Sequence, residues 1–356
     1  MKFATFLFCL ASASAALFEQ LPDGRTRSQE ELKAIADDAD VNRKCHTQNA
    51  NYIPALVPGK YVESAFHNCF RTAAQIDELF NAFAARHPSV VTKEAVATTT
   101  KGQTIFSYTL RNGPPKKQAI YVQSLIHARE WIAGSSNFYT VSKILDDITT
   151  NVTGGITDAY DVIVVPIFNR DGFDLTWTGK RYQRKNANQV DLNRNFPGPF
   201  DNPNPPSPSA DDYPGPNPLS EAESKSLHAW LLGKPKGYIK AFIDVHSYAG
   251  YVLLPVGDTE DALPGNTDTK LRGLGQRVGK ALGGYTAGRP YELLYKAYHT
   301  FQDYGYRQFL APSITIEVKG NDFVAPVSSI RTRGIEIYNG LTQFAKEVTT
   351  YYKTRD

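Results

Sequence analysis

The sequence lacks the features that mark nucleic-acid-binding and membrane-spanning proteins. Its 356 residues carry a formal net charge of only +3, and Lys and Arg form no continuous basic stripe, so we expect no nucleic-acid partner. No internal repeat is visible, and after the N-terminal segment no apolar run is long enough to cross a bilayer. The remaining composition, 41% hydrophobic and 21% charged, is that of a folded soluble protein. We expect a monomer without a membrane partner.

The N-terminus has the pattern of a secretory signal peptide. Lys2 supplies a positive charge, Phe3 to Leu10 is apolar, and Ala13-Ser14-Ala15 fits the small-x-small site that signal peptidase cuts. A membrane anchor is the alternative, but this apolar core is too short to span a bilayer. We therefore predict that residues 1–16 are a signal peptide and that the protein is secreted and extracellular.

Residues 17–60 differ in composition from the rest of the chain. Ser28 to Asp40 is acidic and has the spacing of a helix, and Arg43-Lys44 is a basic pair of the kind that processing proteases cut. A loop with two prolines and a glycine follows. The segment is either a short pro-segment or an N-terminal arm, and the sequence leaves both readings open.

Two cysteines remain once the signal peptide, with Cys9, is removed. They are Cys45 and Cys69. In an oxidising compartment two cysteines suggest one disulfide bond.

The chain after Thr72 has the pattern of one α/β domain, which we place at residues 61–356. Apolar residues at helical spacing follow Thr72, and Lys101-Gly102 joins two alternating segments into a predicted hairpin of Val90–Val96 and Thr104–Leu110. Five further apolar runs alternate with helical patterns and predict a mixed, largely buried sheet: Ala119–Val122, Val162–Ile167, Ile239–Val245, Val252–Val256 and Ile314–Val318.

Two helix starts and one long loop can also be placed. Ser220 to Glu223 is expected to form a capping box. The last helix should begin near Pro326, with one inward stripe at Ile330, Gly334, Ile337, Leu341 and Phe344. The segment Pro197–Pro218, rich in Pro, Asn and Ser, is too long for a simple connection and is a candidate rim of a binding cleft.

Two short motifs at the ends of apolar strands offer metal-binding side chains. His127 and Glu130 follow the strand that starts at Ala119, and His246 ends the strand that starts at Ile239. Side chains at this spacing can converge on one cation, and two His with one Glu form the ligand set of a catalytic zinc rather than of a structural one. Motifs this short often arise by chance, so they need support from the rest of the chain.

That support comes from a resemblance to the metallocarboxypeptidases of the carboxypeptidase A/B family, in which carboxypeptidase A is a standard example of such a zinc site. The resemblance covers about residue 65 to the C-terminus. It rests on six ordered blocks: His127–Trp131, Asn169–Phe173, Arg181–Lys185, Asp191–Phe196, Asp244–Tyr248 and Ile314–Val318. The family implies an eight-stranded mixed sheet flanked by helices on both faces, and a hydrolase that removes single residues from peptide and protein C-termini.

The resemblance also implies a role for each matching residue. One zinc ion per chain would be bound by His127, Glu130 and His246, with Asp191 orienting His127. Glu317 would be the general base, and Arg184 would stabilise the oxyanion that forms from the scissile carbonyl. The terminal carboxylate of the substrate would be bound by Asn193, Arg194 and Tyr295. Arg129 would lie in a neighbouring subsite.

Three departures from the family limit what can be carried over. Residues 17–60 are far fewer than the folded pro-domain of the familiar members, so latency by that mechanism is not expected. The loop between Tyr295 and Asp303 lacks the family's usual glycines. Just before Asp303 stands Gln302, where the A type has an apolar residue and the B type an Asp that binds basic side chains. An uncharged Gln predicts a preference for uncharged C-terminal side chains.

Two other functions are compatible with the same fold. A catalytically silent binding protein would be marked by loss of Glu317 or of a zinc ligand, and all are present. A deacylase of small-molecule amides would not need the set of Asn193, Arg194 and Tyr295. A cytosolic enzyme that trims tubulin-like tails is disfavoured by the signal peptide.

Overall fold

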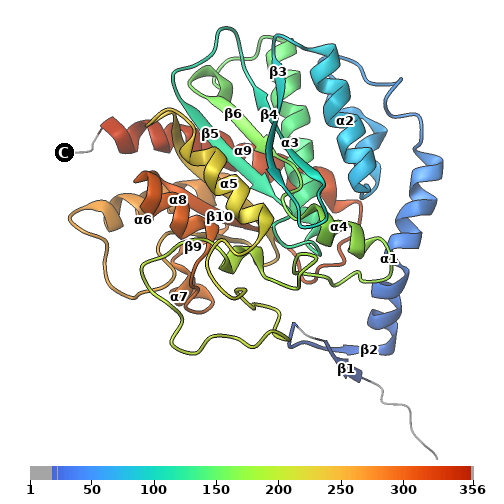
Figure 1. Cartoon of the computed structure of the whole chain (residues 1–356). Coiled ribbons are helices and arrows are strands. Elements are labelled where there is room, and N and C mark those ends of the chain that lie inside the picture. The colour runs from blue at the N-terminus through green and yellow to red at the C-terminus, as the bar shows by residue number, and fades with distance from the viewer. Residues whose placement is uncertain (1–17, 22, 354–356) are drawn as a thin grey trace, which may run out of the picture.

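The computed structural model describes residues 18–21 and 23–353, and most of them form one eight-stranded sheet with helices on both faces (Figure 1). The order of the strands is β3(Val91–Thr98), β4(Thr104–Leu110), β6(Asp161–Val165), β5(Ala119–Ser124), β7(Ile239–Ser247), β10(Ser313–Val318), β8(Tyr251–Leu253) and β9(Thr286–Gly288). Strands β6, β5, β7 and β10 run parallel, whereas β3, β4 and β8 pair antiparallel with their neighbours towards the centre. The predicted mixed α/β sheet is confirmed.

Each face of the sheet has its own hydrophobic core. Helices α2(Ala73–Arg86), α3(Trp131–Thr149), α6(Thr267–Ala281) and α9(Ser329–Lys353) pack on one face, where Ile120 and Val122 of β5 are buried. Helices α5(Ala222–Leu232) and α8(Phe301–Phe309) cover the other face, against Ala119 and Tyr121. Adjacent residues of β5 thus point to opposite cores, which is why the strand reads as one continuous apolar run. The remaining short helices are α4(Arg170–Thr176), α7(Pro290–Leu293) and the 3₁₀ turns Tyr61–Glu63, Ala65–Asn68, Ile156–Asp158 and Leu192–Arg194.

Several elements lie where the sequence predicts them. Thr72 is the N-cap of α2 and forms a capping box with Gln75, and strands β3 and β4 form the expected hairpin. At its turn Gly102 has φ of +79°, a conformation in which glycine is preferred. The last helix begins at Ser329, and the five residues of its predicted inward stripe are all buried.

Other details differ from the prediction. The predicted capping box at Ser220 is wrong, because α5 has Glu221 as its N-cap with no side-chain cap, and the Ser220 hydroxyl donates to Glu221 Oε1 at 2.8 Å. Strand β8 stops at Leu253 instead of continuing to Val256. The three-residue edge strand β9 is not foreseen, because three residues do not establish an alternating pattern.

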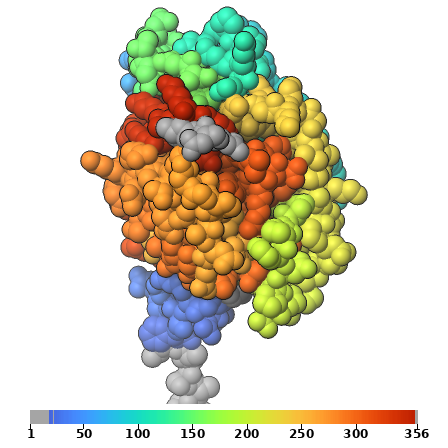
Figure 2. All heavy atoms as spheres, turned by 90° about the vertical axis from the view of Figure 1, so that its left-hand side faces the viewer, coloured from blue at the N-terminus to red at the C-terminus, as the bar shows by residue number. Residues whose placement is uncertain are grey.

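The N-terminal segment is a hairpin followed by a long helix. Strands β1(Phe18–Gln20) and β2(Thr26–Ser28) pair antiparallel, and α1(Gln29–Gln48) starts with a capping box between Ser28 and Glu31. Figure 2 shows this segment, in blue, at the lower end of the molecule. Helix α1 extends eight residues beyond the predicted end at Asp40 and includes the basic pair Arg43-Lys44.

The predicted disulfide bond between Cys45 and Cys69 is present, with the two Cα atoms 5.9 Å apart. The predicted signal peptide, residues 1–16, lies outside the described residues, so the division of the N-terminus stays a prediction. In the part of the chain that the structure describes, no helix is both long enough and apolar enough to span a bilayer.

Candidate active site

The two metal-binding motifs meet at one edge of the sheet. His127 and Glu130 lie in the connection between β5 and α3, and His246 lies near the end of β7. Strands β5 and β7 are parallel neighbours, with Ser124 opposite Val245. The carboxyl ends of parallel strands lie at the same edge, where α/β proteins usually place their ligands. The strand order therefore brings together side chains that are more than a hundred residues apart in sequence.

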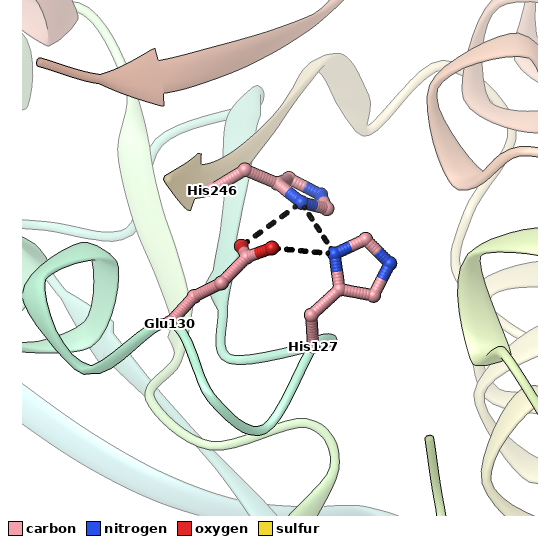
Figure 3. A group of neighbouring side chains, drawn as sticks. All are labelled: His127, Glu130 and His246. Carbon is pink, nitrogen blue, oxygen red and sulfur yellow. Dashed lines mark hydrogen bonds and ion pairs between the residues drawn. The ribbon is translucent and has the colours of Figure 1, made fainter. Parts of the chain in front are cut away.

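The three side chains point toward one another (Figure 3). His127 Nδ1 lies 2.8 Å from Glu130 Oε1, and His246 Nδ1 lies 3.1 Å from His127 Nδ1 and 3.2 Å from Glu130 Oε2. One ligand atom from each residue can be chosen so that all lie within 4.8 Å of one another, and all three residues are buried. Two imidazole nitrogens and a carboxylate converge here with a donor set that suits a single zinc ion.

A further carboxylate lies near the far nitrogen of each histidine. His127 Nε2 lies 3.2 Å from Asp191 Oδ1, and His246 Nε2 lies 2.9 Å from Asp244 Oδ2. The hydrogen bond to Asp191 orients the His127 ring. His246 and Asp244 lie within ion-pair distance, but their geometry is not that of a hydrogen bond. Both rings present Nδ1 to the site. The part that Asp244 plays was missed in the sequence, although Asp244 precedes His246 by two residues on a strand and so must share its face.

The charges around the site favour a cation. Burial by itself would raise the pKa of Glu130, but the adjacent His127 and His246 outweigh it and lower the pKa below its usual value. Burial opposes the charge of Asp191 in the same way, and Arg184 and His127 together bring the pKa of Asp191 well below its usual value. Both carboxylates are therefore ionised at neutral pH, as metal ligation and its support require.

Glu317 and Arg184 lie on either side of the triad. Glu317 lies on β10 opposite His246 of β7 and lines the same cleft. Burial, followed by the nearby Glu130, raises the pKa of Glu317 to about 7, although His246 acts in the opposite direction. Arg184 donates to Asp191 Oδ2 from Nε and Nη2, at 3.0 and 2.7 Å, and its Nη1 lies 3.3 Å from His127 Nδ1.

A second positively charged side chain marks the other part of the cleft. Arg194 is buried and donates from Nη2 to the Tyr295 hydroxyl at 3.1 Å. Asn193 is held by Phe301, whose amide donates to Asn193 Oδ1 at 2.8 Å. Tyr295 lies in a loop, and the residue is 54% accessible to solvent. The structure thus brings Asn193, Arg194 and Tyr295 together.

Gln302 lines the same cleft and carries no formal charge. Other uncharged residues of this lining are Leu253, Pro290, Leu294, Ala297, Thr300 and Thr315. Gln302 is 3% exposed, and its Nε2 lies 3.5 Å from Asp303 Oδ1, a long hydrogen bond. Burial and the nearby Asp258 raise the pKa of Asp303 to about 7. Gln302 therefore separates the cleft from a carboxyl group behind it.

The predicted site residues, with one exception, border one cavity of about 500 Å³, which we call the active-site cleft. Of the predicted site residues, Asp191 alone is not part of its lining, because it lies behind His127. Arg129 lines the cleft, donates to Asp211 Oδ2 at 2.8 Å and lies 4.2 Å from the centre of the Phe323 ring. Asp211 belongs to the segment predicted as a rim, Pro197–Pro218, which does border the cleft.

The family model described as zinc carboxypeptidase matches residues 76–340, a range that includes every predicted site residue. The chain belongs to the zinc carboxypeptidase family. The resemblance inferred from the sequence, the enzyme class of zinc metallocarboxypeptidase and the single zinc ion are thereby confirmed.

Individual zinc carboxypeptidases are similar to this chain over most of its length. Carboxypeptidase A1 of Mus musculus is 29% identical over 282 residues, 73% of this chain and 66% of its own length, and carboxypeptidase A2 of Mus musculus is 28% identical over 78% of this chain and 70% of its own length. The chain thus spans about two thirds of the length of the curated relatives it matches.

Solved structures share the carboxypeptidase fold. Carboxypeptidase A from Helicoverpa armigera has a TM-score of 0.77 at 21% identity and covers 92% of this chain and 83% of its own. Bovine thrombin-activatable fibrinolysis inhibitor, in complex with tick carboxypeptidase inhibitor, has a TM-score of 0.72 at 24% identity and covers 80% of this chain and 99% of its own. The fold agrees with the prediction, and the roles of individual residues stay predictions.

Proposed function

We propose that this member of the zinc carboxypeptidase family is a secreted exopeptidase that removes single, uncharged residues from the C-termini of peptides and proteins. One observation supports this function most strongly. The active-site cleft combines the His127, Glu130 and His246 group with a partly buried carboxyl group, Glu317, and with a buried guanidinium group, Arg194. Together these are the parts that hydrolysis next to a free carboxylate requires.

Glu317 is the proposed general base. When bound by the triad, zinc supplies Lewis-acid chemistry that polarises a carbonyl group and a water molecule. Glu317 accepts a proton from the attacking water and passes it to the leaving amine, so that one side chain acts as base and then as acid. Arg184 is held against Asp191 by two hydrogen bonds and stabilises the negative charge that develops on the scissile carbonyl oxygen.

Arg194, Asn193 and Tyr295 are the proposed site for the substrate's terminal carboxylate. The planar guanidinium group can bind both carboxylate oxygens, which gives the site its geometry. Arg194 has the Tyr295 hydroxyl and the carbonyl of Asn193 as its hydrogen-bond partners, and among the described residues no carboxylate lies within ion-pair distance of it, so a substrate carboxylate would supply a direct counterion. This favours an exopeptidase over an amide deacylase whose substrate has no such carboxylate.

Gln302 is the proposed determinant of side-chain preference. An ammonium or guanidinium group bound beside Gln302 would lose water without gaining an ion pair with that side chain, because an amide carries no charge. A polar neutral side chain can form a hydrogen bond with the amide of Gln302 instead. We expect aliphatic, aromatic and small neutral C-terminal residues to be preferred over Lys and Arg.

The proposed setting is extracellular, with the protein acting as a monomer without nucleic-acid or membrane partners. The predicted signal peptide supports secretion, and so does the disulfide bond between Cys45 and Cys69, because such bonds persist in oxidising compartments. Peptides and proteins with a free C-terminus are the proposed substrates.

The function can be tested on N-blocked dipeptides that end in Phe, Leu, Arg, Lys or Glu. We expect release of the neutral residues, complete loss of activity with a chelator and recovery when zinc is added back. Release of none of the five residues by zinc-loaded protein would favour the silent binding protein, and fastest release of Arg or Lys would overturn the proposed preference.

A further inference from the structure

We propose that the N-terminal arm, residues 18–48, stays on the active enzyme and extends the active-site cleft into a groove for apolar substrate residues that precede the scissile bond. The arm consists of the β1–β2 hairpin and α1. The proposal rests on the proposed function, because it concerns the substrate of the same site. It gives residues 17–60 a role other than that of a removable pro-segment.

Buried polar contacts join the arm to the catalytic domain. Asp38 of α1 pairs with Arg181 at 2.6 Å, and both side chains are less than a tenth exposed. Arg181 also donates to the carbonyl oxygens of Arg129 and Phe323, at 2.7 Å each, and both of these residues line the cleft. Removal of the arm would leave Arg181 as a buried charge without its carboxylate, which is strongly unfavourable.

The basic pair does not lie in a place where proteases usually cut. Arg43 and Lys44 are within α1, and Arg43 donates to Asp40 and to the carbonyl oxygen of Trp177 in the catalytic domain. Proteolytic nicking concentrates in exposed loop tips and termini rather than in ordered helices. Directly after the pair, Cys45 is joined to Cys69, which fixes the end of the helix.

The hairpin borders the cleft without filling it. Asp23 lines the cleft, and Arg25 donates to the hydroxyl of Tyr248, another lining residue, at 2.7 Å. Arg27, which is buried, pairs with Asp23 and, at 3.0 Å, with Asp322. With the hairpin in this position the cleft still has a volume of about 500 Å³. The hairpin is therefore a wall of the cleft.

A second cavity, which we call the arm groove, continues from this wall. Its volume is about 480 Å³, and it lies between the arm and residues 176–189 of the catalytic domain. Arg184 and Asp211 line both the arm groove and the active-site cleft, so the two cavities are neighbours that share part of their walls. The arm contributes apolar side chains to the groove: Leu21, Leu32, Ile35, Ala36 and Ala39.

The position of the groove identifies its occupant as the substrate chain itself. With the terminal carboxylate at Arg194 and the scissile bond at Glu317, the preceding residues leave through the remaining part of the cleft, beside Arg129 and the hairpin. An extended peptide advances about 3.3 Å per residue, so a blocked dipeptide stays inside the cleft and only longer peptides reach the arm groove. Leu32 and Ile35 are both only partly buried, and covering them with apolar side chains is favourable.

The groove is tested with blocked peptides of two, four, six and eight residues that all end in Phe, each made with Leu or with Ser at the upstream positions. We expect kcat/KM to rise roughly tenfold between the dipeptide and the Leu-containing hexapeptide, as burial of one or two apolar side chains would produce. The Ser series should rise much less. In Ile35→Gln the rise should largely disappear, and in the matched control Ala34→Gln, at an exposed position of the same helix, it should persist.

The outcomes separate this proposal from the proposed function. If the dipeptide is not cleaved, the proposed function fails. The dipeptide could instead be cleaved while kcat/KM stays the same for longer peptides, for Leu and Ser peptides, and for the Ile35→Gln variant. That result would refute the proposed role of the arm groove. Retention of the arm is tested by intact mass of the active secreted protein. A chain that includes residues 18–48 agrees with the proposal, and activity that appears only after cleavage near Arg43 overturns it.

Discussion

A negative charge at position 302 should redirect the enzyme toward basic C-terminal residues. Gln302 is buried and lines the cleft, and Gln302→Asp would place a carboxylate beside the bound side chain. Two opposite unit charges 4 Å apart attract by ~4 kcal/mol at an effective dielectric constant of about 20. Desolvation of both groups consumes part of this, and a net ~1.5–3 kcal/mol is typical of hydrogen bonds to charged groups. The corresponding change in preference is roughly 10- to 150-fold.

The assay is the ratio of kcat/KM for blocked dipeptides that end in Arg and in Leu. The matched control is Gln302→Asn, which shortens the side chain by the same methylene group but keeps the amide. We expect the ratio of kcat/KM for Arg to that for Leu to rise roughly 10- to 150-fold in Gln302→Asp and to change little in Gln302→Asn. Measurements belong above pH 7, because the pKa of the adjacent Asp303 is raised to about 7 and its protonation state would otherwise vary. Equal ratios in the two variants would refute this reasoning.

Four further predictions concern the general base, the zinc ion, the ion pair between the arm and the catalytic domain, and the disulfide bond. Glu317→Gln should retain zinc, measured by metal analysis, but lose roughly 10²–10⁴-fold in kcat, because the amide cannot accept the proton. Removal of zinc should abolish hydrolysis yet leave the circular dichroism spectrum unchanged, since the core of this large domain does not depend on the metal. Asp38→Ala should lower the free energy of unfolding in urea by ~3–5 kcal/mol, because Arg181 is left buried and unpaired, and the double variant with Arg181→Met should recover much of this loss. Reduction of the Cys45–Cys69 bond should cost about 3 kcal/mol by the loop-entropy argument, and mass spectrometry that finds free thiols in secreted protein would contradict the assignment.

Much of the fold follows from local sequence patterns. The apolar runs from Ala119 and Ile239 are rich in β-branched and aromatic residues and are buried on both sides. Such runs are typical of central strands, so the sequence predicts them as strands rather than as helices or loops. The helix after Thr72 has both a cap and an apolar stripe. The edge strand β9 and the hairpin β1–β2 have only three residues per strand, and tertiary contacts rather than a periodic pattern determine them.

The candidate site was predictable where a motif identifies the residue type. His127, Glu130 and His246 are brought together by the order of the strands, and the structure agrees with the prediction. The contribution of the hairpin was not predictable, because Arg25 and Tyr248 are 223 residues apart. Contacts of this kind depend on how the arm docks, for which the sequence contains no local signal.

The central claim is that the enzyme cleaves next to a free C-terminal carboxylate held by Arg194 and Tyr295. The most direct test compares one blocked peptide ending in Phe as the free acid with the same peptide as its C-terminal amide, using protein whose zinc content has been measured. We predict rapid release of Phe from the acid and hydrolysis of the amide that is slower by at least roughly a hundredfold, since the buried guanidinium then has no anion to bind. Equal rates for acid and amide would contradict the account.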